Sequence, residues 1–390
     1  MSNHPICGLS DLLDLFIESV ELDLFRVNAF RIVGLNVRAR DLEIRKQGEK
    51  LQFIARHGPI TASMTGPLPL EPFPTDEMIS EALQRLRDPE RRLIEEFFWF
   101  WPHEEPAKED PALALLRNRD TESATLIWNE AERSGHQHHA SHNLAVMFHT
   151  LALDIEYAKQ TDATSKKLAK LQYAYWEKGL THWRKTLADE EFWNRLQVRV
   201  FELNDPRLTT STVDRLRTSL PLILLVITAK ITANAAARRA DYEIRRYQRL
   251  ITESGFDEEL VEYATRRVAN HVRTQISANC KASEAEANLD PRNAHEGVGR
   301  LLTQSPPLLA AIDALPNTTI IGDEARDEIA TMVTDCLLLY WNEVKDWRTS
   351  MRLLEKTRPY AVSLIVRERL DYLRAEFLRA AFNEEPPGLD

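Results

Sequence analysis

Apolar residues recur at intervals of three and four along almost the whole chain, the spacing of one face of an α-helix. In the first hundred residues this pattern predicts helices over 9–24, 39–55, 77–86 and 89–100. Asn28 can cap a short turn, Thr75 or Asp76 can cap the third helix, and Asp88-Pro89 interrupts the pattern before the fourth. A loop rich in Pro, Gly, Ser and Thr precedes Thr75.

Beyond residue 111 the helical pattern continues with few interruptions. It predicts helices over 112–118, 120–133, 138–159, 164–187, 189–201, 211–235, 238–253, 257–280, 291–304, 306–314, 323–344, 346–356 and 359–382. Only 12 of the 390 residues are glycine, so tight turns should be few. The sequence therefore predicts an all-α fold.

Residues 39–55 are expected to have two different faces. Ile44, Leu51 and Ile54 share the face that should point inward, whereas Arg45, Lys46 and Lys50 should point outward. Between Phe25 and Gly58 there are eight Arg or Lys against three Asp or Glu, in a chain whose net charge is −10. This segment is thus a local basic region, although the overall charge argues against a general nucleic-acid binder.

Three prolines and four acidic residues in Trp101 to Pro111 cannot continue a helix cheaply. The predicted organisation is an N-terminal module over 1–102, an acidic linker over 103–111 and a helical domain over 112–390. A further division near 205–210 is possible, because Asp205-Pro206 indicates a turn.

Two segments of the helical domain resemble each other. Residues 125–153 and 337–365 each contain Trp-Asn-Glu, a short polar turn and an apolar-periodic helix. Each segment has about the size of a tetratricopeptide hairpin. No regular period of that length runs through the chain, so we expect tetratricopeptide-like (TPR-like) or α-solenoid-like packing of helical hairpins rather than a true repeat array.

The N-terminal module resembles the J domain of DnaJ-type co-chaperones. The matching segments, in the order of that family, are "NAFRIVGL" at 28–35, Ala39 with "IRKQGEKLQ" at 44–52, and "ISEALQRLRDPERR" at 79–92. The resemblance covers roughly residues 25–100. Where the family has its His-Pro-Asp signature, this chain has Arg56-His57-Gly58.

The resemblance implies a degenerate J domain that docks on a DnaK-type chaperone or DnaK-like ATPase without stimulating its ATP hydrolysis, since Gly58 supplies no carboxylate. The basic residues Arg45, Lys46 and Lys50, with Arg56 and His57, are then candidate partner contacts. The alternative is an ordinary solvated helix face, with Glu43 and Glu49 pairing locally.

The aromatic run "FFWFWP" at 97–102 allows two interpretations. Phe97, Trp99 and Trp101 could form an exposed partner site, or the run could pack the J-like module onto the helical domain.

Five histidines, His136, His138, His139, His142 and His149, form the most suggestive cluster for enzyme chemistry. His138 and His142 share a helix face, but no carboxylate or cysteine stands at ligand spacing. We therefore expect turn and packing histidines, with no metal, no other cofactor and no catalytic residues. A metal-dependent enzyme built on this cluster is the minor alternative.

Cys7, Cys280 and Cys336 are too far apart for a zinc ribbon or a disulfide framework, which fits a reducing cytoplasm. The N-terminus lacks the pattern of a signal peptide, and the apolar run from Leu220 to Ala229 is too short to span a membrane.

The expected function is that of a cytoplasmic, non-enzymatic adaptor. The alternative is a sensor or adaptor in a bacterial stress or antiphage defence system, which contacts a non-chaperone protein or a membrane surface. The partner's identity and the oligomeric state stay open.

Overall fold

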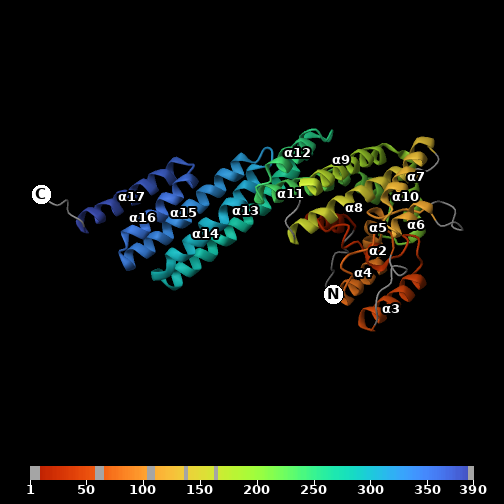
Figure 1. The fold of residues 1–390 in the computed structure, drawn as a ribbon, viewed down its shortest axis with the longest axis horizontal. Helices are drawn as coiled ribbons and strands as arrows, with labels where there is room; N and C mark the ends of the chain where they lie inside the picture. Colours follow the sequence, from red (N-terminus) through yellow and green to blue (C-terminus); the bar gives the residue numbers. More distant parts are fainter. Residues whose placement is uncertain (1–8, 58–65, 103–109, 136–138, 162–165, 385–390) are drawn as a thin grey trace, which may run out of the picture. The chain divides into compact units, whose positions relative to one another are not determined.

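The structure, a computed structural model, describes residues 9–57, 66–102, 110–135, 139–161 and 166–384. Within these ranges the chain forms helices and contains no strand, so the predicted all-α class is confirmed. The α-helices, drawn in Figure 1, are α1 Leu9–Ser19, α2 Ala29–Val33, α3 Asp41–His57, α4 Asp76–Arg87, α5 Pro89–Phe97, α6 Pro111–Arg117, α7 Thr121–Ser134, α8 Ala140–Thr161, α9 Lys166–Ala188, α10 Glu190–Leu203, α11 Thr210–Ala237, α12 Asp241–Thr252, α13 Glu258–Leu289, α14 Ala294–Asp313, α15 Thr319–Val344, α16 Trp347–Thr357 and α17 Leu364–Glu384.

Polar side chains begin the N-terminal helices as the sequence predicts. Asn28 Oδ1 accepts hydrogen bonds from Phe30 N and Arg31 N at the start of α2. Thr75 caps α4, and Asp88 both ends α4 and caps α5, whose first residue is Pro89. These caps satisfy backbone N–H groups that have no partner inside the helix.

The helix boundaries differ from the prediction most clearly at Pro306-Pro307. The sequence predicts a break there, but α14 continues through both prolines. The backbone hydrogen bonds lost at the prolines are offset by tertiary packing, because Leu301, Leu309 and Ile312 are buried on the same helix. The intrinsic helix propensity of single residues has little influence on where a helix ends when one face of that helix is buried in this way.

The chain divides into two compact units, Met1–Ile227 and Thr228–Asp390, so the division falls within α11. The prediction placed the main division at 103–111, most of which lies outside the described residues, and a further one near 205–210. In the first unit, α8 and α9 form a long hairpin, seen side by side in Figure 1, and α3 packs on α4. In the second unit α13, α14 and α15 each pack against the other two, and α16 and α17 follow.

Polar contacts join the segment before residue 102 to the helices after residue 111. Arg31 Nη2 lies 2.6 Å from Asp154 Oδ2 of α8, and the Arg26 guanidinium lies 3.9 Å from the centre of the Tyr157 ring. The predicted J-like module therefore belongs to the same compact unit as the helices α6 to α10.

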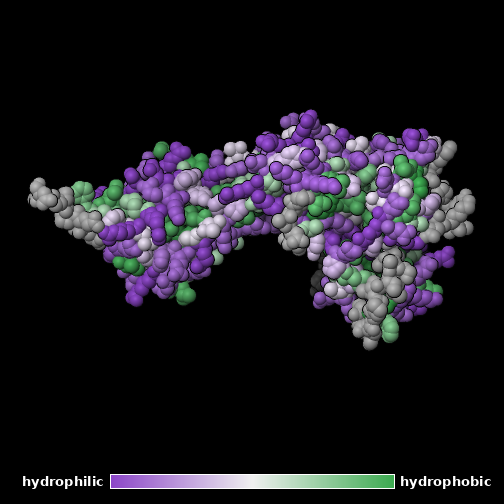
Figure 2. Space-filling model, in the orientation of Figure 1, coloured by the Kyte–Doolittle hydropathy of each residue, from purple (hydrophilic) through white to green (hydrophobic). Residues whose placement is uncertain are grey.

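Within the described residues one helix, α11, is long and apolar enough to cross a membrane, and 72% of its apolar window is buried inside the structure. A core helix has the same properties, so this is weak evidence for a span. Figure 2 shows a largely hydrophilic face with apolar side chains scattered over it.

The first unit contains a buried carboxylate, that of Glu96 on α5, which is fully inaccessible to solvent. Glu96 Oε1 accepts from Arg92 Nε at 2.7 Å and from Arg199 Nη2 at 2.8 Å, and its Oε2 accepts from Arg199 Nε at 2.7 Å. Arg92 also donates to the carbonyls of Val37 and Ala39. One carboxylate thus joins α5, α10 and the turn that precedes α3, and we call these contacts the Glu96 network.

We expect Glu96→Ala to lower the free energy of unfolding by about 3–5 kcal/mol, because it leaves the buried Arg92 and the half-buried Arg199 without the carboxylate that they share. The matched control is Glu202→Ala, which removes the exposed partner of the same Arg199 and should cost at most about 1 kcal/mol. Urea unfolding of both variants measures the difference. An equal loss of unfolding free energy in the two variants would contradict the expectation that the buried carboxylate stabilises the fold more than the exposed one.

Candidate functional site

Helix α3 is fixed on one side by apolar packing. Ile44 and Leu51 are almost fully buried, and Ile54 is buried with them. Gly48 lies on this side, where a Cβ atom would come within 2.6 Å of Leu83 Cδ1 on α4. The absence of a side chain at Gly48 therefore lets the two helices approach closely and hold α3 in one orientation.

The opposite side of α3 is exposed. Arg45, Lys46 and Lys50 face solvent, as predicted from the hydrophobic pattern. Leu42 and Phe53 lie at the two ends of this stripe, 52% and 67% exposed. We call these five residues the α3 surface; it combines positive charge with two large apolar side chains, a composition that suits contact with another protein.

A cavity of about 610 Å³ lies beside the α3 surface, between α3 and α4. Leu42 and Arg45 line it from α3, and Leu83 and Arg87 line it from α4. Gln52 Nε2 donates to Ser80 Oγ at 3.2 Å across the two helices. The α3 surface is thus continuous with a groove of mixed charge, since Asp41 and Glu49 line it together with Arg45 and Arg87.

Arg56 and His57, the other predicted basic contacts, are the last residues of α3. Their side chains lie outside the described residues, as does Gly58. Their role in partner contact stays a prediction.

The aromatic run is packed inside the first unit. Phe97 is 0% and Trp99 1% exposed, and the Phe97 ring lies 5.8 Å from Trp183 and 5.7 Å from Trp193 between ring centres. The predicted exposure of Phe97 and Trp99 at a partner site is therefore wrong for the folded chain, because both rings are buried and Phe97 packs against α9 and α10. Trp101 is half-buried and borders a cavity.

Two described histidines of the candidate cluster, His142 and His149, are buried and pack against aromatic rings. His142 donates from Nε2 to the Phe97 carbonyl at 2.7 Å. His149 stacks on Trp176 with 3.7 Å between ring centres. His136 and His138 lie outside the described residues. Among the residues that are described, no group of His, Cys, Asp or Glu is arranged to hold a metal ion.

The hydrogen bonds of His149 define its protonation state. Trp183 Nε1 donates to Nδ1 at 3.1 Å, so Nδ1 carries no proton and Nε2–H donates to the Trp176 carbonyl at 3.1 Å. Burial lowers the pKa of His149 to about 3 and that of His142 to about 4. A Cβ on Gly179 would lie 1.9 Å from the His149 ring, so the imidazole fills the space that this glycine leaves.

Acid should destabilise the first unit through these rings. In the unfolded chain His142 and His149 bind a proton below a pH of about 6.5. In the folded chain they bind it only near pH 4 and pH 3. The free energy of unfolding therefore falls as the pH falls from about 6.5 to these values. We expect a loss of about 2 kcal/mol per ring between pH 7 and pH 5.

His149→Gln should make this pH dependence shallower, since the amide can accept from Trp183 or donate to Trp176 but does not titrate. His271→Gln, which changes an exposed histidine, should keep the wild-type dependence. Urea unfolding at pH 7 and pH 5, followed by tryptophan fluorescence, measures both. If the stability of His149→Gln depended on pH as steeply as that of the wild type, His149 would not be the buried, neutral group described above.

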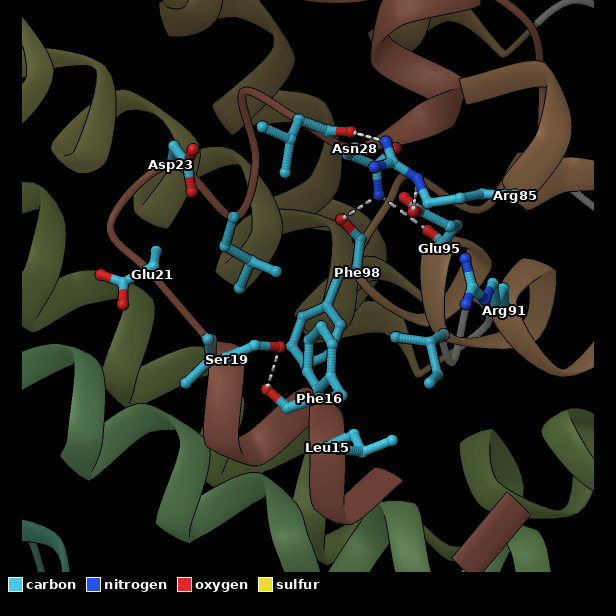
Figure 3. A pocket seen from close by; sticks show the side chains of 14 residues that line it. Leu15, Phe16, Ser19, Glu21, Asp23, Asn28, Arg85, Arg91, Glu95 and Phe98 are labelled. Carbon is cyan, nitrogen blue, oxygen red and sulfur yellow. Dashed lines mark hydrogen bonds and ion pairs between the residues drawn. The ribbon is translucent and has the colours of Figure 1, made fainter. Parts of the chain in front are cut away.

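A second cavity, of about 350 Å³, lies between α1, the 20–28 segment, α4 and α5. Figure 3 shows Arg85, Glu95 and Asn28 together at one end, and the stacked rings of Phe16 and Phe98 at the other. Arg85 Nε lies 2.8 Å from Glu95 Oε1. Burial raises the pKa of Glu95, while Arg85 and the Ala29 N–H act in the opposite direction. Asn28 Nδ2 also donates to the Glu95 carbonyl at 2.9 Å, and the Ala29 N–H donates to Glu95 Oε2 at 2.7 Å, so these polar groups join the helices around the cavity.

The described cysteines, Cys280 and Cys336, are buried in the second unit. Burial raises the pKa of Cys280 to about 12 and that of Cys336 to about 11. Both thiols therefore stay protonated at neutral pH, as expected of small core residues.

Sequence reasoning missed a group of arginines that the fold brings together. Arg38 and Arg40, just before α3, line one cavity with Arg195 and Arg199 of α10. The two pairs are separated by more than 150 residues in the chain, and neither segment has a motif that points to the other.

Comparisons of the chain with protein-family models, with curated proteins and with solved structures found no match. The chain is thus described by its fold and its surfaces: an all-α protein whose first unit presents a basic and apolar helix face.

Proposed function

We propose that the chain is a non-enzymatic adaptor that docks on a partner protein through the α3 surface. The observation that carries this proposal is the exposure of Arg45, Lys46 and Lys50 between Leu42 and Phe53, on a helix that is fixed from behind by its packing on α4. A rigid surface binds with a smaller entropic cost than a flexible one.

Charge supports an acidic partner surface. Residues 25–58 carry eight Arg or Lys against three Asp or Glu, in a chain whose net charge is −10. Arg26 and Arg31 pair with Asp154 of α8, and the remaining six basic residues still exceed the three acidic ones. A local positive field of this kind increases the rate at which an oppositely charged surface is encountered. The exposed Leu42 and Phe53 can then bury apolar area in the bound complex.

We infer from the resemblance to J domains that the partner is a DnaK-type chaperone or a DnaK-like ATPase. In support, α2, α3, α4 and α5 occur in the order that the matching segments imply, and the Asp88-Pro89 pair begins α5. Because Gly58 stands where the family has its catalytic-signature aspartate, docking leaves the partner's ATP hydrolysis at its basal rate. The α7–α8 and α15–α16 hairpins belong to the TPR-like scaffold of this adaptor.

Simultaneous reversal of charge at Arg45, Lys46 and Lys50 to Glu should slow association with the DnaK-type chaperone of the host by about ten-fold or more at low salt. The fold should be retained, since exposed ion pairs contribute at most about 1 kcal/mol each. Binding kinetics at two salt concentrations, with ATP hydrolysis followed in the same mixtures, test both parts of the proposal.

The matched control reverses Lys166, Lys167 and Lys170, three exposed lysines at the start of α9. This variant should associate like the wild type. Equal association rates for the α3 variant and the wild type, without salt dependence, would show that the α3 surface is only solvated. Clear stimulation of ATP hydrolysis would contradict the adaptor role.

A further inference from the structure

Helix α17 of the second unit packs on its neighbours α15 and α16 through one apolar face (Figure 1). The buried residues of this face are Val366, Leu370, Leu373 and Phe377. The centre of the Phe377 ring lies 5.3 Å from that of Trp341 on α15. Intervals of four, three and four residues are those of the inner face of a helix, so one side of α17 is fully accounted for by the second unit.

The opposite face of α17 is also apolar, but it is exposed. Ile365 is 78%, Tyr372 64% and Phe382 69% exposed, and Leu364 and Leu378 beside them are exposed too. A helix with apolar residues on two opposite faces is typical of one that is covered on both. Large apolar side chains gathered on one exposed face indicate an interaction site.

Residues on this exposed face recur with the spacing of a coiled coil. Alternating intervals of three and four residues separate Ile365, Glu368, Tyr372, Ala375, Arg379 and Phe382. We call these six residues the α17 seam. Positions with this spacing form the contact between the two helices of a coiled coil, so the seam has the geometry to pair with a second helix along most of α17.

The α17 seam is complementary to itself when two copies run antiparallel. A two-fold axis between Leu373 and Arg374 brings each residue of the seam opposite the one at the same distance beyond the axis. The facing pairs, each formed twice, are Ile365 with Phe382, Glu368 with Arg379 and Tyr372 with Ala375. The first pair joins two apolar side chains, the second joins opposite charges, and the third places a large ring against a small residue.

The two charges of the seam are accessible for this contact. Among the residues that the structure describes, the exposed Glu368 carboxylate has no ion pair or side-chain hydrogen bond. Arg379 Nη1 lies 2.5 Å from Glu376 Oε1 of the same helix, but this pair is exposed, and exposed pairs contribute little to stability. The guanidinium has five N–H donors, so Arg379 can bind a second carboxylate while it keeps the first.

We propose that α17 pairs antiparallel with α17 of a second copy of this chain, and that Glu368 and Arg379 fix the register of the pair. A partner of one charge sign would leave either Glu368 or Arg379 without a counter-charge, whereas a second copy supplies one to both. A shift of the two helices would place these charges against apolar side chains, which is why a charged pair in a seam specifies its register. The α17 seam belongs to the second unit and does not depend on docking through the α3 surface.

The test is the mass of the full chain in solution as a function of concentration, measured by sedimentation equilibrium. We expect the wild type to pass from monomer to dimer as the concentration rises. Ile365→Ser combined with Phe382→Ser should leave a folded monomer, because both side chains are exposed in the single chain. The matched control, Leu289→Ser with Ile320→Ser, changes two exposed apolar residues outside α17 and should dimerise like the wild type.

Reversal of charge tests the register. Glu368→Arg places an arginine opposite Arg379 twice in the dimer and should raise the dimer Kd at least about ten-fold. Arg379→Glu should have a similar effect, whereas the double variant restores opposite charges and should recover dimerisation. The control Glu284→Arg reverses an exposed glutamate of α13 and should leave the Kd unchanged.

Three results would overturn the proposal. A wild type that stays monomeric at the highest concentration tested would leave the α17 seam to a helix of another protein. A dimer that persists in Ile365→Ser with Phe382→Ser would place the contact between copies on another face. A double charge variant that dimerises no more tightly than Glu368→Arg alone would exclude the antiparallel register.

Discussion

The buried carboxylate of Glu96 is the constraint on which the first unit depends. Removing a carboxylate from water is costly unless every lone pair is used, and here two arginines occupy both oxygens. Arg92 comes from the same helix, whereas Arg199 comes from α10, 103 residues further along the chain. Glu96 therefore meets Arg199 only when the N-terminal helices lie on α8–α10. The need of the buried carboxylate for both arginines thus favours one arrangement of these helices. The aromatic rings around Phe97 exclude water from the same region.

The proposed α3 surface is built on this framework. Ile44, Gly48 and Leu51 hold α3 from behind against α4, and Arg92 of the Glu96 network donates to the carbonyls of Val37 and Ala39 just before α3. Buried contacts thus position exposed positive charges, so that a partner meets a prepared surface.

The sequence predicted features that depend on near neighbours in the chain. The all-α class, the caps at Asn28, Thr75 and Asp88, and the two faces of α3 all follow from residues within one or two turns of each other. Features that depend on distant segments were missed: the burial of Glu96, the hydrogen bonds of His142 and His149 to distant segments, and the one cavity that Arg38 and Arg195 both line. The local rule that proline ends a helix failed at Pro306-Pro307, because packing in the second unit outweighs the lost backbone hydrogen bonds. The J-like and TPR-like assignments stay predictions.

The most direct test of adaptor function is site-specific photo-crosslinking in the native host. A photoreactive amino acid is placed at Lys46 on the α3 surface and, as a control, at Tyr372, which is 64% exposed on α17 of the second unit. After irradiation, the crosslinked species are identified by mass spectrometry. Docking through the α3 surface predicts a crosslink from position 46 to a DnaK-type chaperone or DnaK-like ATPase, and none to that protein from position 372. The same ATPase captured from position 372 but not from position 46 would contradict docking through α3.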